Sequence, residues 1–222
     1  MTTRTLISRT IFIFLVVFAF CGSILAMQTA SKMKRYNQKS GSIEYQITGS
    51  MMSGTETLYF DDFGAREAKY TATEVKVAGF SQKTNTAAYI EGSTIYTVDL
   101  NTNTGTKIEN KIMKNLEGKD LQDAGKQMLK DMGGKQIGNE TFMGKNCEVW
   151  EIKSLGSKTW IWNGLPLKTD VNMMGQQVSY TATKISDTVD AKKLQRPTNI
   201  QYREGVDPTK MLEQMKKNMP KN

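Results

Sequence analysis

The stretch GSIEYQIT, residues 41–48, decides the fold class of this chain. Its apolar residues Ile43, Tyr45 and Ile47 alternate with polar ones. A period of two is typical of a β-strand that buries one face and exposes the other. The segment is therefore predicted to be a half-buried strand.

Similar patterns continue along the chain, separated by residues that favour turns. Asn163-Gly164 is the clearest separator, because this dipeptide favours the two-residue turn of a β-hairpin. Asp61 to Gly64, Gly92-Ser93 and Asn101 to Gly105 are further predicted turns. The other predicted strands are 56–60, 69–77, 87–90, 94–100, 147–152, 159–162, 165–171, 178–183 and 198–203. Roughly eight to ten short strands at this spacing indicate a mainly β (α+β) fold, with a curved antiparallel sheet or half-open β-barrel.

Two helices are expected beside the sheet. Between Lys119 and Met132 the apolar residues recur at helical spacing, and Gly133-Gly134 ends the pattern. A C-terminal helix is predicted to begin with Asp207 as N-cap and Pro208 at its first position. The fold prediction thus includes one inserted helix and one C-terminal helix.

The N-terminus indicates export. Residues 1–26 contain two arginines, then an apolar run and small residues, which is the order found in a signal peptide. Cleavage after Ala26 is the first interpretation, and an uncleaved membrane anchor is the alternative. Cys21 follows the bulky Phe20, which does not favour lipidation at that cysteine. The expected location is the periplasm or cell envelope, with secretion as a further option.

The expected domain organisation is a signal peptide (1–26), a polar tether (27–41) and one half-barrel-like β domain (42–222). Removing the two signal-peptide arginines lowers the formal net charge from +8 to +6. A mild basic excess favours contact with an anionic membrane surface, although diffuse charge is also typical of a solvated face. No basic patch interleaves with aromatic residues, so nucleic acid is not an expected partner.

Catalytic chemistry has little support in the sequence. The chain has no histidine, which removes the usual general base and the commonest metal ligand. Asp61 and Asp62 fit a turn in which aspartates bond to their own backbone. Glu148 and Glu151 would lie on opposite faces of a strand. Cys147 would be the one cysteine of the processed chain, and it is interpreted as a small buried residue. The prediction is a protein that is not an enzyme and has no catalytic residue, cofactor or metal.

The apolar residues suggest a binding surface instead. The chain has 14 methionines and three tryptophans, and flexible methionine side chains suit a surface that accepts varied hydrophobic shapes. An equally weighted interpretation is that these are ordinary core residues. Trp160 and Trp162 are two apart on a predicted strand, so they should share a face. The candidate residues for a hydrophobic ligand are Met51, Met52, Trp160, Trp162, Met173 and Met174.

Three segments carry a family resemblance: GSIEY at 41–45, GTETLYFDDFG at 54–64, and 160–175. With the signal peptide, they resemble an uncharacterised family of exported bacterial β-domains. More distantly, the organisation is similar to periplasmic lipoprotein carriers and outer-membrane lipoprotein-sorting proteins. That resemblance implies an unclosed antiparallel barrel, capped by helices, around a hydrophobic cavity.

The functional hypothesis is an exported, non-enzymatic protein that binds a lipid, an acyl chain (including that of a lipoprotein) or another hydrophobic ligand in a concave face. The alternative is a structural or interaction protein of the cell envelope with a filled core and no ligand.

Overall fold

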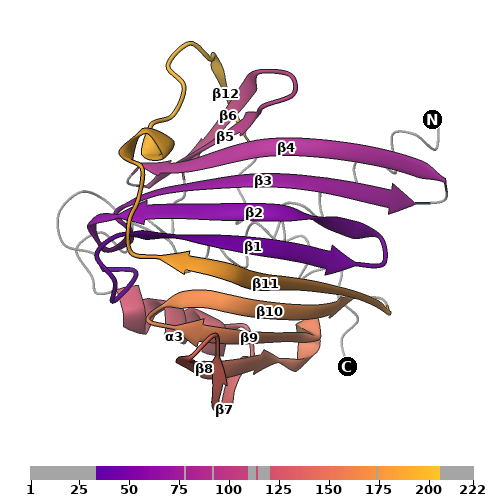
Figure 1. Cartoon of the computed structure of the whole chain (residues 1–222), viewed down its shortest axis with the longest axis vertical. Helices are drawn as coiled ribbons and strands as arrows, with labels where there is room; N and C mark the ends of the chain where they lie inside the picture. The colour runs from indigo at the N-terminus through magenta and orange to yellow at the C-terminus, as the bar shows by residue number, and fades with distance from the viewer. Residues whose placement is uncertain are drawn as a thin grey trace.

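Period-two patterning produces the sheet that dominates this structure, which is a computed structural model (Figure 1). The residues described in it are 34–77, 79–91, 93–109, 114, 121–173 and 175–205. The predicted signal peptide and C-terminal helix lie outside these residues.

The described residues form a 12-stranded sheet in the order β12-β6-β5-β4-β3-β2-β1-β11-β10-β9-β8-β7. Its first half is a meander of β1 (Gly41–Gly49), β2 (Met52–Asp61), β3 (Arg66–Val77), β4 (Phe80–Glu91), β5 (Thr94–Asp99) and β6 (Thr104–Glu109). Its second half contains β7 (Lys135–Phe142), β8 (Lys145–Ile152), β9 (Ser157–Trp162), β10 (Leu165–Met173) and β11 (Gln176–Ser186). The short β12 (Tyr202–Glu204) pairs parallel with β6. The sheet is curved and its two end strands do not pair, so the predicted open antiparallel architecture is confirmed (Figure 1).

β1 joins the two meanders. Its residue Ile43 lies opposite Leu58 of β2 on one edge and opposite Ile185 of β11 on the other. Directly opposed residues of antiparallel strands project from the same face, so these three side chains form one apolar row. Pairing on both edges thus places β1 near the centre of the sheet.

Predicted turns are confirmed at two strand connections. Asp62, Phe63 and Gly64 have φ values of 50°, 56° and 88°, within the short 3-10 helix η1 (Asp62–Gly64). The Asp62 amide donates a 2.8 Å hydrogen bond to Asp61 Oδ1, as expected for an aspartate that caps its own turn. Asn163 and Gly164 have φ values of 53° and 81° between β9 and β10, as a type I′ hairpin turn requires.

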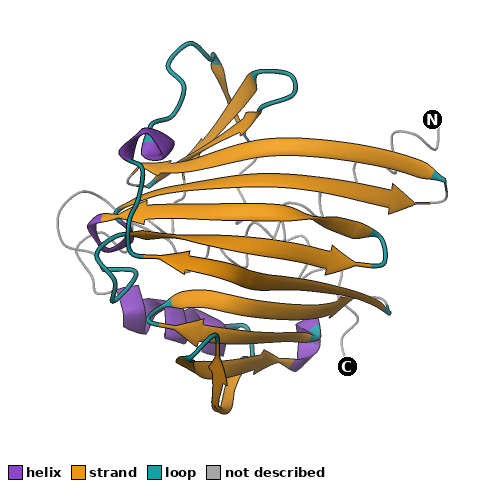
Figure 2. Ribbon diagram, viewed as in Figure 1, coloured by secondary structure: helices purple, strands orange, loops and turns teal. Residues whose placement is uncertain are grey.

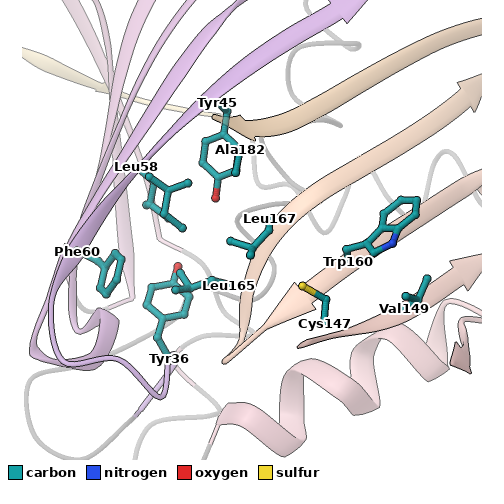
Figure 3. Packing of buried hydrophobic residues seen from close by; sticks show 11 residues of the cluster. Tyr36, Tyr45, Leu58, Phe60, Cys147, Val149, Trp160, Leu165, Leu167 and Ala182 are labelled. Carbon is teal, nitrogen blue, oxygen red and sulfur yellow. The ribbon is translucent and has the colours of Figure 1, made fainter. Parts of the chain in front are cut away.

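One face of the sheet carries the largest apolar cluster of the described residues, and we call it the inner face. Ile43, Tyr45 and Leu58 project from it and are at most 6% exposed. Tyr45 Oη on β1 donates a 2.9 Å hydrogen bond to the Pro166 carbonyl on β10, across the intervening β11. Residues of β2 and of β8 to β10 belong to one apolar cluster on this side, so the inner face is concave there. Figure 3 shows Tyr45, Leu58 and Leu167 converging between the two halves of the sheet.

The opposite face of β3 to β6 is covered by the segment after β11. This segment includes η3 (Ala191–Leu194), and its residues Leu194 and Ile200 pack on Ala68, Ala87 and Val98. All five side chains are at most 8% exposed. The upper half of the sheet therefore has a second hydrophobic core on its outer face.

Residues 34–40, which the sequence assigns to a polar tether, are packed against the sheet. The amides of Arg35 and Tyr36 both donate to the Phe63 carbonyl, and the Asn37 amide donates to the Asn163 carbonyl. Arg35 and Tyr36 are 2% and 1% exposed. We call residues 34–40 the strap, because they link the turn after β2 to the turn after β9.

The inserted helix is confirmed as α3 (Leu121–Asp131), which lies beside the lower strands (Figure 2). Lys126 of α3 forms a 2.7 Å ion pair with Glu148 of β8. A second 3-10 helix, η2 (Lys153–Leu155), connects β8 to β9. Among the described residues, no helix is long and apolar enough to span a membrane.

Several predicted boundaries were wrong. β6 and β7 were not predicted, because Thr104–Glu109 and Lys135–Phe142 lack an alternating apolar face. Gly105 was assigned to a turn, but it lies within β6, where Tyr202 packs closely over it. Of the predicted strand 198–203, only Tyr202 and Arg203 are in β12.

Candidate ligand-binding face

The inner face changes character from one strand to the next. One row across the sheet runs from Ile185 on β11 through Ile43 and Leu58 to Lys69 on β3 and Ala88 on β4. Its first three members are apolar, and the fourth is a lysine. Along this row the inner face is therefore apolar on β11, β1 and β2 and becomes polar at β3.

β3 contributes a run of polar inner-face residues. Glu67, Lys69 and Thr73 are 2%, 9% and 4% exposed. Thr73 Oγ1 and Thr84 Oγ1 lie 2.7 Å apart in a hydrogen bond. Since buried polar groups are normally hydrogen-bonded, the Glu67 carboxylate calls for a partner.

Glu67 finds two partners in the strap. Arg35 Nη1 and Tyr36 Oη donate to the same oxygen, Glu67 Oε2, at 2.7 Å and 2.6 Å. Arg35 Nε, Arg35 Nη2 and Glu67 Oε1 are buried without a hydrogen-bond partner. A buried ion pair that keeps unsatisfied atoms contributes little net stability, because the desolvation of both charges offsets their attraction.

Tyrosines connect the apolar and polar parts of the inner face. Burial raises the pKa of Tyr45 well above its ordinary value, and the charges of Glu56 and Glu67 raise it further. Burial and the charge of Glu56 also raise the pKa of Tyr180 on β11. These hydroxyls stay protonated at neutral pH, and the Tyr45 hydroxyl donates its hydrogen to the Pro166 carbonyl.

The structure describes the side chains of two of the four methionines predicted to bind a ligand. Met52, at the start of β2, is 6% exposed and packs with Ile47 and Val178 in a small apolar cluster. Met51 is partly buried in the preceding turn. Met173 ends β10, its side chain is not described, and Met174 lies outside the described residues.

The two predicted tryptophans belong to one cluster. Trp160 is 6% exposed within the large apolar cluster, and the partly buried Trp162 packs against it. Trp160 Nε1 donates a 2.7 Å hydrogen bond to Glu140 Oε2, and the Lys158 and Lys168 ammonium groups lie over its ring at 4.5 Å and 4.3 Å. Its indole is thus fully surrounded by protein groups.

Cys147 behaves as the sequence interpretation expected. It is 0% exposed within the large apolar cluster, and burial raises the pKa of its thiol. Glu148 and Glu151 are three apart on β8, so they project from opposite faces and make no dyad. Across the described residues, no group of three His, Cys, Asp or Glu side chains could hold a metal ion.

Sequence reasoning missed Arg35, Glu67 and Lys69. The alternation in Arg66–Val77 places Ala68 and Tyr70 on one face, and that face packs outward against η3. The polar residues between them thus read as the solvated side, although they are buried. The buried polar face could not be predicted, because two distant segments, the strap and the region around η3, determine which side of β3 is covered.

No protein-family model matches the chain, and no match is found among curated proteins. Among solved structures, the crystal structure of LprF from Mycobacterium bovis is similar, with 11% sequence identity and a TM-score of 0.33. The similarity covers 71% of this chain and 90% of LprF.

Proposed function

We propose that this chain is a non-enzymatic binding protein of the cell envelope that holds an acyl chain or another hydrophobic ligand against its inner face. The observation that carries the proposal is the apolar strip across β11, β1 and β2 on the concave side of a sheet that does not close. Ligand sites are typically concave and mostly apolar, with a few polar groups that fix orientation. The polar residues of β3 would supply such groups.

One observation favours the alternative, a structural or interaction protein with a filled core. Ile43, Ile47 and Phe60 are at most 1% exposed, as expected where side chains fill the space. In a ligand-binding protein, these residues would have to separate when a ligand enters. The two functions therefore differ in whether the inner face opens.

A matched pair of alanines separates these functions. Ala182 lies on the inner face opposite Tyr45, and Ala87 lies in the outer cluster; they are 3% and 0% exposed. Enlarging either residue to leucine costs about 1–3 kcal/mol of folding stability, because the added atoms overpack a core. Ala182→Leu alone should weaken the binding of a fluorescent fatty-acid probe, since it alone fills the inner face.

The measurement is a probe titration of the folded wild-type protein and both variants. Native mass spectrometry of the purified protein should also detect a bound lipid. Absence of probe binding to the wild type, or equal binding to both variants, would assign the filled core instead.

A further inference from the structure

Tyr36 fills a position in the inner-face cluster that no strand supplies. Among the described residues, the other buried members of this cluster lie on β1, β2 and β8 to β11. Tyr36 comes from the strap, is 1% exposed and meets the Phe60 ring edge-on, with 4.9 Å between the ring centroids. Figure 3 shows its ring pointing from the strap into the cluster. The inner face is therefore filled partly by a residue that does not belong to the sheet.

The strap is held by few main-chain hydrogen bonds. The Phe63 carbonyl accepts the amides of two strap residues, and the Phe63 amide donates a 2.7 Å hydrogen bond to the Lys39 carbonyl. On the other side, the Asn37 amide donates a 3.0 Å hydrogen bond to the Asn163 carbonyl. By contrast, β1 pairs with a strand along both of its edges. Local opening involves the segments that are least bonded, so the strap should open before the sheet does.

The docked strap also keeps buried polar atoms without partners. Arg35 Nε, Arg35 Nη2 and Gln38 Oε1 are buried without a hydrogen bond, and so is Oε1 of Glu67, the ion-pair partner of Arg35. Such atoms are costly to bury, because each has lost its hydrogen bonds to water. When the strap lifts, water reaches its polar atoms again, and their hydration offsets part of the contacts that are lost. The docked strap is therefore less stable than its burial alone indicates.

The closed position of the strap is nevertheless well defined. An added Cβ at Gly64, in the turn after β2, would lie 2.9 Å from Arg35 Cβ. One at Gly164, in the turn after β9, would lie 2.4 Å from the Arg35 carbonyl oxygen. Both turns thus lack a side chain where the strap passes over them, and the strap has a defined seat between them.

We propose that the strap is a gate. It leaves the turns after β2 and β9 when a hydrophobic ligand enters, and the apolar part of the ligand takes the place of the Tyr36 ring beside Phe60. This inference rests on the proposed function and adds the route by which the ligand reaches the inner face. A closed gate accounts for a closely packed inner face, because Tyr36 occupies the space that the ligand would fill.

The first test measures hydrogen exchange of the wild-type amides by NMR, with and without saturating dansylundecanoic acid, a fluorescent fatty acid. The amides that bond the strap to the turn residues are those of Arg35, Tyr36, Asn37 and Phe63. They should exchange about tenfold or more faster when the probe is bound, because a ligand that binds only the open state raises the population of that state. Amides of β1 should exchange no faster than before.

The second test measures the rate of probe binding by stopped-flow fluorescence. Tyr36→Ala removes the ring that holds the gate closed, and it should bind the probe about tenfold or more faster, because the open fraction sets the apparent rate. Tyr89→Ala is the matched control, since Tyr89 is a 3% exposed tyrosine of the outer cluster, and it should keep the wild-type rate. Thermal unfolding establishes that each variant is folded.

The outcomes separate the gate from the proposed function. If neither the wild type nor Tyr36→Ala binds the probe, the proposed function fails, and the gate fails with it. If the wild type binds the probe while its strap amides keep their protection, or if Tyr36→Ala binds no faster than Tyr89→Ala, the protein binds a hydrophobic ligand but the strap is not its gate. The exchange measurement needs no mutation, so it decides the question even if Tyr36→Ala does not fold.

Discussion

Arg35 Nη1 lies 2.7 Å from Glu67 Oε2, and both side chains are almost completely withdrawn from water. The two residues are 32 positions apart and connect the strap to the third strand. Arg35 Nε, Arg35 Nη2 and Glu67 Oε1 remain buried without a hydrogen bond. Removing one residue of the pair leaves the other charge buried and unpaired, which costs more stability than replacing both residues with apolar ones.

Removing one partner of this pair should therefore destabilise the protein strongly. Arg35→Met leaves the Glu67 carboxylate buried with Tyr36 as its remaining donor, and we expect a loss of about 3–5 kcal/mol in the free energy of unfolding. The double variant Arg35→Met, Glu67→Met should lose much less than the sum of the two single variants. Chemical denaturation of the four proteins measures both quantities. Lys184→Met, which removes an exposed ion pair with Glu44, is the control and should leave the midpoint unchanged. Additive losses would mean that the pair does not act as a unit.

The hairpin turn after β9 should tolerate no side chain at Gly164. Its φ is 81°, and an added Cβ would lie 2.4 Å from the Arg35 carbonyl oxygen of the strap. Gly175 has a similar φ of 77°, but nothing lies within 4 Å of an added Cβ. Gly175→Ala should cost about 1–2 kcal/mol, the strain of a left-handed alanine, and Gly164→Ala clearly more. Equal melting temperatures of the Gly164→Ala and Gly175→Ala proteins would show that the strap moves away from the added Cβ without loss of stability.

Alkaline pH should unfold the protein cooperatively. Burial raises the pKa of Tyr36, Tyr45 and Tyr180 in the folded state. These groups lose protons in the unfolded state near pH ~10 but not in the folded one, so their stabilisation is complete below that pH and declines as the pH rises. The slope is about 1.4 kcal/mol per pH unit for each such tyrosine. Ultraviolet absorbance should show these phenols ionising together with the loss of circular dichroism. Tyr45→Phe should make the decline shallower. Ionisation of Tyr36, Tyr45 and Tyr180 before the protein unfolds would contradict the burial of these three side chains.

The thiol of Cys147 should react only when the protein opens. It is fully buried, and its raised pKa lowers the thiolate fraction further. We expect its labelling by a disulfide reagent to follow the unfolding rate. The control is a double variant, Cys147→Ala with Asn146→Cys. It moves the thiol to the exposed preceding position and should be labelled rapidly. Rapid labelling of wild-type Cys147 would show local opening of β8.

The sequence predicts the sheet well and its polar interior poorly. Alternation in residues 41–48 and the Asn163-Gly164 turn are local signals, and both are confirmed. Lys135–Phe142 pairs as a strand without an apolar face of its own, so its position depends on β8. The site of Glu67 and Lys69 depends on which segments cover β3, and alternation alone cannot distinguish a buried polar face from a wet one. Trp160 was correctly placed with Trp162, but its contacts with Glu140, Lys158 and Lys168 arise from register between strands.

The central position of β1 constrains the order in which this molecule assembles. One edge of β1 pairs with its immediate successor, while the other waits for β11, which begins at Gln176. A contact between residues so far apart in sequence closes a large loop, and such contacts form slowly. During synthesis and refolding, β1 therefore presents an unpaired strand edge beside its apolar face, the combination that favours aggregation. Among the described strands, the first to be made completes its pairing only after the last long one has arrived.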